Sequence, residues 1–422
     1  MPLPAAPHVT VKDLRRANRS AVLRRLFLHG PLNRVALAQL TGLSSGSITN
    51  VTAGLIEEGL VCEVGTEESN GGRPRVLLHL DPGFGNVIGV EVGEACLRVE
   101  AFDLAMDVLG TLEVPLPAGP HEPEAVVGPL VGAVGALREQ LGPGRRWLGV
   151  GIAVPGTVTA GPGGSRAHAP VIGWQDVPLE GMVASRTGLT VRVGSLARAL
   201  GQAEVWLGAG QGARDVAVAL WGASVGAAVF SEGGLCWPPA PSAGEWGHTV
   251  LVAGGRPCRC GGAGCVEAYL GAGALLEDWR RADPAAAAET PSGTEQWADR
   301  LLAAAGSDGA AARVLEQAAT YLGYAVANLV HLFNPERVVL GGWLGLRLGP
   351  ALLGPARATM AAQALGHPGA RASLELGHLG PEAVALGASA LVVDELLSDG
   401  GPPPVAAGPA GRRPGTFSSG GR

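Results

Sequence analysis

The sequence predicts a mixed α/β protein in which a winged helix-turn-helix precedes a body of alternating strands and helices. Three observations predict this division. Apolar residues recur at helical spacing through the first 60 residues, which carry seven basic and three acidic side chains in a chain whose net charge is −6. Two short strands then flank a Gly-Gly-Arg-Pro tip. From residue 86 onward, apolar strands alternate with helical segments, and glycine stands at the strand ends.

Length and composition limit the class of protein. The 422 residues are enough for two or three compact units, and 47% hydrophobic with 16% charged residues describes a folded chain. Neither a membrane-length apolar run nor a charged start before an apolar core is present, so we expect a cytoplasmic protein without a membrane partner. The predicted domains are 1–84, 85–398 and a disordered Gly/Pro-rich tail over 399–422.

Two helices are predicted first. Apolar spacing predicts a helix over about residues 13–28, and His29-Gly30-Pro31 ends it. Asn33 is suited to cap a second helix, Arg34–Leu40. The residues of this helix that we expect to face inward are Val35, Leu37 and Leu40.

A tight turn and a third helix follow. Gly42 can supply the positive φ of the turn, Leu43 fills the angle between the helices, and Ser44 or Ser45 caps the third helix. Its apolar stripe is formed by Ile48, Val51, Leu55 and Ile56. The other face presents the small or polar residues Ser45, Gly46, Ser47, Thr49, Asn50 and Ala53. Such a face suits a helix that enters a major groove.

The wing completes this unit. Strands are predicted at Leu60–Val64 and Arg75–Leu80, and Arg73 in the tip between them can reach a minor groove or a phosphate. A solvated helix face would explain the basic charge alone, but its combination with a wing favours double-stranded DNA as the partner. The candidate DNA-binding residues are Arg34, Ser44, Ser45, Ser47, Thr49, Asn50 and Arg73.

The body is predicted as an α/β sheet structure. The expected strands are Val87–Val92, Cys96–Phe102, Trp147–Val154, Val191–Val193, Val216–Leu220 and Arg337–Leu340. The expected helices are Glu124–Leu141, Leu196–Leu207 and Ala311–Phe333. Glycine-rich turns carry little weight here, because the chain contains 67 glycines.

One histidine and three of the six cysteines form a metal-binding pattern. His248, Cys258, Cys260 and Cys265 have the spacing His-x9-Cys-x-Cys-x4-Cys. One imidazole and three thiolates are a closed tetrahedral set suited to structural Zn²⁺, and disulfides are rare in the cytosol. The alternative is three free cysteines and an unrelated histidine.

These features together resemble the ROK family of repressors and sugar kinases, and within it the NagC/XylR-type repressors. The resemblance runs from about Asp13 to Asp394. Besides the cysteine pattern, it is carried by Leu43-Ser44, Gly71-Gly72-Arg73-Pro74, Val154-Pro155-Gly156, the segment 173–179, Gly244-Glu245-Trp246-Gly247-His248 and Asn334-Pro335-Glu336. It implies two actin-like lobes with a sugar and ATP cleft between them, a structural zinc site, and a homodimer or homotetramer.

The resemblance also locates where kinase chemistry should lie. Family kinases carry Asp-x-Gly-Gly-Thr in the first phosphate loop, and this chain has Glu91-Val92-Gly93-Glu94-Ala95. The second phosphate loop, 222–228, is altered as well. Leu196 stands where the family has the Asp that accepts the proton of the sugar hydroxyl. The resemblance therefore implies no catalytic residue and no phosphoryl transfer.

Part of the family's sugar site is retained. The resemblance assigns sugar contacts to Glu245, His248 and Glu267. Three other contact positions are occupied by Val171, Ser195 and Leu196, which leaves hydroxyl groups of a sugar unpaired at about 1–3 kcal/mol each. A sugar, a more apolar small molecule and no effector at all stay open.

The expected function is transcriptional regulation, in first place repression of genes for sugar or secondary metabolism. A dimer would bind a roughly palindromic DNA operator. The alternative is an ATP-dependent sugar kinase with an accessory DNA-binding domain. A third possibility is a scaffold or sensor whose body binds a partner protein.

Overall fold

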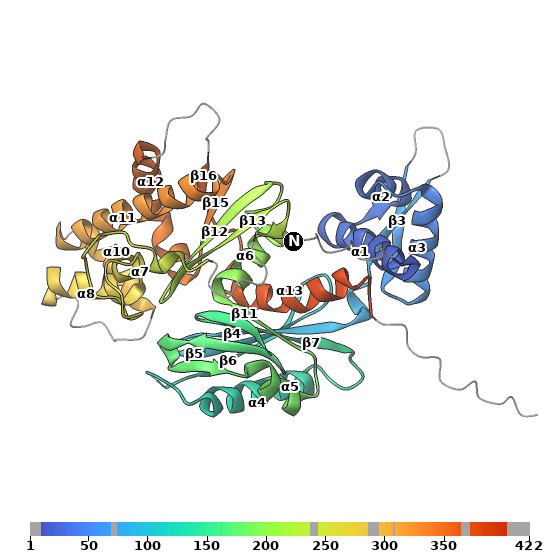
Figure 1. Cartoon of the computed structure of the whole chain (residues 1–422), viewed down its shortest axis with the longest axis horizontal. Helices are drawn as coiled ribbons and strands as arrows, with labels where there is room; N and C mark the ends of the chain where they lie inside the picture. The colour runs from blue at the N-terminus through green and yellow to red at the C-terminus, as the bar shows by residue number, and fades with distance from the viewer. Residues whose placement is uncertain are drawn as a thin grey trace, which may run out of the picture.

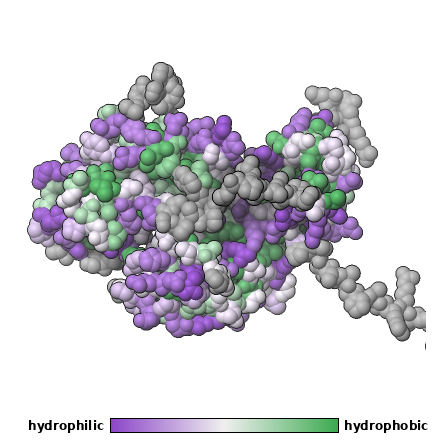
Figure 2. Space-filling model, in the orientation of Figure 1, coloured by the Kyte–Doolittle hydropathy of each residue, from purple (hydrophilic) through white to green (hydrophobic). Residues whose placement is uncertain are grey.

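A small front unit and a two-lobed body make up the chain (Figure 1). The structure is a computed structural model that describes residues 10–68, 74–117, 119–161, 163–236, 244–285, 295–306, 309–363 and 372–402. In the space-filling view the front unit stands beside the body as a separate mass (Figure 2). No helix in these ranges combines the length and the apolar character that a bilayer crossing requires.

The front unit is a winged helix-turn-helix. Its elements are α1 (Val11–His29), β1 (Leu32–Asn33), α2 (Arg34–Thr41), α3 (Ser45–Glu57), β2 (Val61–Glu67) and β3 (Arg75–Leu80). The three strands form an antiparallel sheet in the order β1-β3-β2. Leu23, Leu26, Leu37, Ile48 and Leu55 are buried at its centre, as the helical spacing of apolar residues predicts.

Side-chain caps set the ends of these helices. The Asn33 side chain accepts hydrogen bonds from the backbone N–H groups of Val35 and Ala36, and thereby begins α2. Gly42 ends α2 in the left-handed region, at φ 71°. Ser44 caps α3 by accepting from the N–H of Ser47. The predicted caps and turn are therefore confirmed, with Ser44 rather than Ser45 as the cap.

The inward positions predicted for α2 are wrong in two of three cases. Leu37 is fully buried, whereas Val35 and Leu40 are 47% and 42% exposed. The reason is that α2 spans only about two turns and packs on one side, against α1 and α3. A single narrow stripe of so short a helix is covered.

The first lobe contains a five-stranded sheet in the order β11-β7-β4-β5-β6. Its strands are β4 (Asn86–Val92), β5 (Cys96–Phe102), β6 (Val108–Pro115), β7 (Trp147–Val154) and β11 (Val191–Ser195). Helices α4 (Pro123–Gln140) and α5 (Leu179–Thr187) belong to this lobe. A small sheet of β8 (Thr157–Gly161), β9 (Gly164–Ala169) and β10 (Trp174–Val177) adjoins it.

The second lobe contains a five-stranded sheet in the order β14-β13-β12-β15-β16. Its strands are β12 (Asp215–Trp221), β13 (Val225–Ser231), β14 (Gly234–Leu235), β15 (Arg337–Gly341) and β16 (Ser373–Leu376). Its helices are α7 (Glu267–Leu270), α8 (Ala272–Ala282), α10 (Gln296–Ala305), α11 (Gly309–Phe333) and α12 (Trp343–Gln363). A large apolar core joins this sheet to α8, α10, α11 and α12.

Two helices, α6 (Leu196–Leu207) and α13 (Ala383–Ser398), fill the space between the two sheets. Helix α13 packs on β4 and β7 of the first lobe, and α6 packs on β12 and β13 of the second. The two helices also pack on each other very closely. A Cβ atom on Gly387 would lie 1.7 Å from the Ala199 carbonyl oxygen, so only glycine fits there.

The front unit and the body share one apolar core. Leu23 and Leu26 of α1 lie in the same buried cluster as Val393 of α13 and Trp206 of α6. The rings of Phe27 and Trp206 meet edge to face, with centroids 5.0 Å apart. The front unit is therefore packed against the two central helices rather than tethered by a linker.

The structure differs from the predicted organisation at the end of the chain and in several helices. Residues 399–402 form a turn on α1, where Arg19 donates to the Gly400 carbonyl, so the predicted tail begins too early; 403–422 lie outside the described residues. Helix α12 was not predicted because Pro350 and Pro355 normally interrupt helices. Helix α13 lacks an amphipathic period because it is buried on nearly every side.

Candidate functional site

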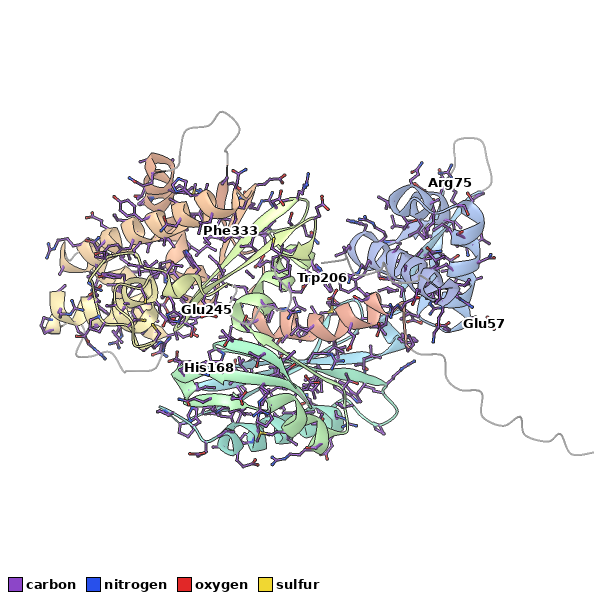
Figure 3. The ribbon with its side chains drawn as sticks, in the orientation of Figure 1. Glu57, Arg75, His168, Trp206, Glu245 and Phe333 are labelled. Atoms are coloured by element: carbon purple, nitrogen blue, oxygen red, sulfur yellow. The ribbon has the colours of Figure 1, made fainter. Side chains whose placement is uncertain are left out.

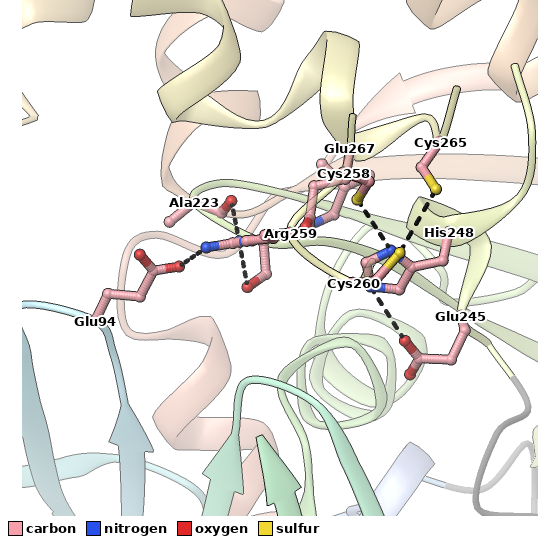
Figure 4. A network of polar contacts seen from close by, with 11 residues as sticks. Glu94, Ala223, Glu245, His248, Cys258, Arg259, Cys260, Cys265 and Glu267 are labelled. Carbon is pink, nitrogen blue, oxygen red and sulfur yellow. Dashed lines mark hydrogen bonds and ion pairs between the residues drawn. The ribbon is translucent and has the colours of Figure 1, made fainter. Parts of the chain in front are cut away.

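The predicted metal ligands come together in the second lobe. The ligand atoms of His248, Cys258, Cys260 and Cys265 all lie within 4.8 Å of one another. Cys258 Sγ is 3.7 Å from His248 Nδ1, and Cys260 Sγ is 3.8 Å from Cys265 Sγ (Figure 4). Two sulfurs bound to one tetrahedral Zn²⁺ at about 2.3 Å each are about 3.8 Å apart. The cluster therefore has the donors and the spacing to hold a metal ion.

Local backbone bonds hold the loop that carries these ligands. Bridges between Val250 and Cys265, and between Pro257 and Ala263, close it into a compact fold. His248 presents Nδ1 to the cysteines, and its Nε2 lies 3.8 Å from Glu245 Oε2. A carboxylate on the second ring nitrogen is the usual means of orienting a metal-binding imidazole.

Arg259 extends from the same loop toward the first lobe. It stands between two of the cysteines, and its guanidinium donates to Glu267 Oε1 at 2.8 Å, to the Ala223 carbonyl at 2.8 Å and to Glu94 Oε1 at 2.9 Å (Figure 4). Burial alone would lower the pKa of Arg259, but its bonds to Glu267 and Glu94 outweigh burial and raise it. Because Glu94 follows β4, the pair joins the two lobes.

The segment 91–95, which resembles the first phosphate loop of family kinases, contains Glu94. Its carboxylate would repel the negative charge of a phosphate that approached it. Nearby on β4, burial raises the pKa of Glu91 to about 7, although Arg98 opposes the shift. Glu94 and Arg259 thus form an ion pair between the two lobes.

The predicted effector residues line one cavity of about 390 Å³ between the lobes. Glu245, His248 and Glu267 all contribute to its wall. Glu267 also accepts a bond of 2.9 Å from the N–H of Val225, which fixes its carboxylate. Val171 and Leu196 line the same cavity, so it has apolar walls where the family's contacts are polar.

The start of α6 lies in this cavity. Ser195 caps the helix by accepting from the N–H of Arg198, and Leu196 faces the cavity as its next residue. Leucine has no group that accepts a proton, so no general base is present at the position of the family's Asp. The loss of a catalytic carboxylate at this position stays a prediction.

The candidate DNA-binding surface is the outer face of α3, on the side of the front unit away from the body (Figure 1). Ser45, Thr49 and Asn50 are exposed there. Ser44 and Ser47 bind each other at the start of the helix, with 3.0 Å between their hydroxyl oxygens. Arg73 lies outside the described residues. The contact of these residues with DNA stays a prediction.

Several arginines of the front unit have partners within the protein. Arg34 Nε donates to Thr52 Oγ1 at 3.1 Å, and its guanidinium lies 3.7 Å from Glu63. Arg19 pairs with Glu58 at 2.5 Å, and Arg24 pairs with Asp394 of α13 at 2.7 Å. Part of the basic charge of the front unit therefore supports the fold and its junction with the body.

The sequence did not predict the roles of three residues that join parts of the structure or line a cavity. Arg259 joins the metal loop to the first lobe, Trp206 joins the body to the front unit, and Arg198 lines a second cavity. The only sequence signals were an arginine between two metal-ligating cysteines, and an arginine where the family has Asn. Neither signal names a partner, because the partners are distant in the chain.

The comparisons with known proteins place this fold among regulators and kinases. Residues 87–395 match the ROK family. The xylose repressor of Caldicellulosiruptor bescii is 28% identical over 402 residues, covering 91% of this chain and 97% of that protein. The DNA-binding transcriptional dual regulator NagC of Escherichia coli is 28% identical over 334 residues, 78% of this chain and 81% of that protein. A glucokinase of Halalkalibacterium halodurans is 30% identical, covering 72% of this chain and 94% of that protein.

Solved structures similar to this fold also include both a regulator and a kinase. A ROK family transcriptional regulator, a homolog of the Escherichia coli MLC protein, superposes with a TM-score of 0.74 and 24% identity, covering 92% of this chain and 97% of that chain. A ROK family glucokinase from Streptomyces griseus, in complex with glucose and AMPPNP, gives 0.62 and 29% identity, covering 73% of this chain and 99% of that chain. The regulator therefore matches a larger share of this chain than the glucokinase does.

Proposed function

Because this chain belongs to the ROK family, we propose that it is a DNA-binding transcriptional repressor whose kinase-like body binds a small effector without phosphorylating it. The observation that carries the proposal is the winged helix-turn-helix packed on two central helices, of which α6 begins at the interlobe cavity. Relatives that match nine tenths of the chain include a xylose repressor. The kinase relatives match less than three quarters of it.

The loss of catalysis is part of this proposal. Leu196 replaces the proton acceptor, and Glu94, which pairs with Arg259, lies in the segment that resembles the first phosphate loop of family kinases. A coupled ATP assay with glucose, xylose and N-acetylglucosamine should detect no turnover. Turnover above the enzyme-free background with any of them would reject the inactive body and favour a kinase with an accessory DNA-binding domain.

The proposed metal is Zn²⁺, held by His248, Cys258, Cys260 and Cys265. Three thiolates and one imidazole leave no open position for a water or substrate, which is typical of a structural site. Bound zinc would stabilise the loop from which Arg259 reaches the first lobe. The proposed assembly is a homodimer or homotetramer, since two recognition helices related by symmetry read a palindromic operator.

DNA binding through α3 can be tested with a matched pair of threonine variants. Thr49 on α3 and Thr320 on α11 each donate to the carbonyl four residues earlier, at 2.9 Å. We expect Thr49→Ala or Asn50→Ala to weaken binding to the operator about tenfold or more, as a lost base contact does, and Thr320→Ala to leave it unchanged.

The measurement is a gel-shift titration on DNA from upstream of the protein's own gene, at fixed salt, with genome-wide capture of bound fragments to find other sites. Absence of binding to any fragment at low salt would reject the proposed function. If the Thr49, Asn50 and Thr320 variants all bind the operator equally well, the proposal of DNA binding stands. The same result would exclude α3 as the helix that contacts the bases.

A further inference from the structure

A second cavity, of about 350 Å³, adjoins the interlobe cavity described above. The two share Gly156, Thr157, Ser195, Gly244 and Glu245 in their walls, so they form adjoining chambers. The second chamber lies between β8, β9 and β11 of the first lobe and β13 and the end of α11 in the second. Its volume falls within the range of small-molecule sites, which is about 300–1,000 Å³.

The walls of this chamber are largely apolar. They include Val158, Val193, Val229, Leu329, Leu332 and Phe333. Leu332 is 67% exposed, so much of its apolar surface is open to a ligand or to solvent. Binding of an apolar ligand is favoured when it removes the apolar surface of a cavity from water. The chamber is therefore suited to a hydrocarbon group rather than to a polyol.

One cation lines these apolar walls. Arg198, in the first turn of α6, has its Nε buried without a hydrogen-bond partner. Burial lowers the pKa of Arg198 and Asp394 opposes the shift, but the structure gives this guanidinium no ion pair among the described residues. A buried donor without a partner destabilises the fold, and a charged one does so more strongly. An anionic ligand would relieve that destabilisation.

The surrounding charges limit which anion can bind. Glu245 lines the same chamber, and His168 of the first lobe lies on the opposite side of the cleft (Figure 3). A phosphate brings nearly two negative charges into a site that has one arginine and one carboxylate. A carboxylate brings one charge and matches the two parallel N–H groups of a guanidinium.

We propose that this chamber binds an apolar monocarboxylic acid, with the carboxylate on Arg198 and the alkyl or aryl part against Leu329, Leu332 and Phe333. Such an acid would be the effector of the proposed repressor. Only this regulatory role rests on the proposed function, because binding of the acid to the chamber does not depend on it. Arg198 lies at the start of α6 and Trp206 at its end against α1, so a ligand on Arg198 contacts the helix that supports the front unit.

The binding test uses the full chain and pairs of probes that differ only in charge. Isothermal titration with hexanoate, octanoate and phenylacetate is compared with their neutral amides. We expect at least one acid to bind ten times or more tightly than its amide. Arg198→Gln should remove that preference, whereas Arg192→Gln, whose partners are Glu180 and Glu395, should retain it.

A measurement without ligand separates loss of the site from loss of the fold. Because Arg198 Nε is buried and unpartnered, Arg198→Gln should melt at the same temperature as the wild type or higher. Failure of all three acids to bind, equal binding of acids and amides, or full binding by the Arg198→Gln variant would overturn the proposal. A marked drop in melting temperature would show that Arg198 supports the fold and would overturn it as well.

The regulatory role is tested separately, by adding the acid that binds to a gel shift on operator DNA. An acid that changes DNA affinity at least threefold in the wild type, and not in Arg198→Gln, supports its role as effector. Binding without any change in DNA affinity would overturn the regulatory role. Absence of DNA binding altogether would reject the repressor while leaving the titration result intact.

Discussion

Arg259 shows how one side chain can link two sites. Its neighbours Cys258 and Cys260 belong to the candidate metal cluster, so a bound ion would fix the backbone from which it extends. Its guanidinium then contacts Glu267 of the effector cavity and Glu94 of the opposite lobe. Exposed ion pairs contribute little to stability, but this pair is part of a network with several hydrogen bonds. The metal loop, the cavity and the lobe contact are thus coupled through a single residue.

Glu91 gives a prediction at the same scale. Burial raises its pKa to about 7, against about 4.3 in an unfolded chain, so the folded state binds this proton more tightly. The resulting penalty is absent below the unfolded pKa and grows as pH rises through the folded pKa. We expect Glu91→Gln to gain on the order of 2 kcal/mol of stability relative to wild type between pH 5 and pH 8.

Urea denaturation of both proteins at pH 5, 6.5 and 8 measures this difference directly. Glu139→Gln, an exposed change on α4, is the control and should show no pH-dependent gain. If the wild type and the Glu91 variant differ by the same amount at all three pH values, Glu91 does not titrate as the structure indicates.

The metal loop illustrates the role of a single element. Residues 248–265 contain short bridges and turns but no long helix or strand, so short-range backbone bonds hold the loop. Side-chain contacts, such as the ion pair between Arg256 and Asp278, add to them. A bound ion would add a cross-link among the four candidate ligands.

We therefore expect the purified wild type to contain about one zinc per chain and Cys260→Ser to contain much less. The variant should lose several degrees in melting temperature because the Arg259 contacts depend on the loop. Cys96→Ser, which changes an exposed cysteine outside the cluster, should retain the metal and the wild-type melting temperature. Elemental analysis together with calorimetry decides this, and full zinc content in Cys260→Ser would exclude the proposed ligand set.

At the scale of the whole molecule, α6 and α13 are the layer that both lobes and the front unit contact. Helix α6 begins at the interlobe cavity and carries Trp206 close to its end, and α13 carries Asp394 to its partner Arg24 on α1. A continuous packed route therefore runs from the cavity through these helices to the front unit.

The Trp206–Phe27 contact tests whether the front unit and body unfold together. We expect the wild type to unfold in one calorimetric transition. Trp206→Ala should lose about 3–5 kcal/mol of stability and unfold in two transitions, because the shared core is interrupted. Trp297 is as deeply buried and also meets another ring, Trp343, edge to face, but it lies in the second lobe. Trp297→Ala should lower the transition without splitting it, and one unsplit transition in both variants would contradict the coupling.

The sequence by itself determined the elements whose signals are local. The caps Asn33 and Ser44, the turn at Gly42, and strands such as Trp147–Val154 follow from neighbouring residues. A cap or a short apolar run involves only a few consecutive positions. The metal ligands belong here as well, since all four lie within 18 residues of the chain and gather in the structure. Local spacing was less informative for α2, where tertiary packing left Val35 and Leu40 exposed.

Only the tertiary structure decided the contacts between distant segments. Glu94 and Arg259 are 165 positions apart, and Phe27 meets Trp206 across the junction of two units. The unpartnered Nε of Arg198 is likewise a property of the chamber around it and not of its neighbours in sequence. Whether a charged side chain is paired, buried or faces a cavity depends on which segments, distant in the sequence, pack together. Local sequence patterns do not predict such contacts.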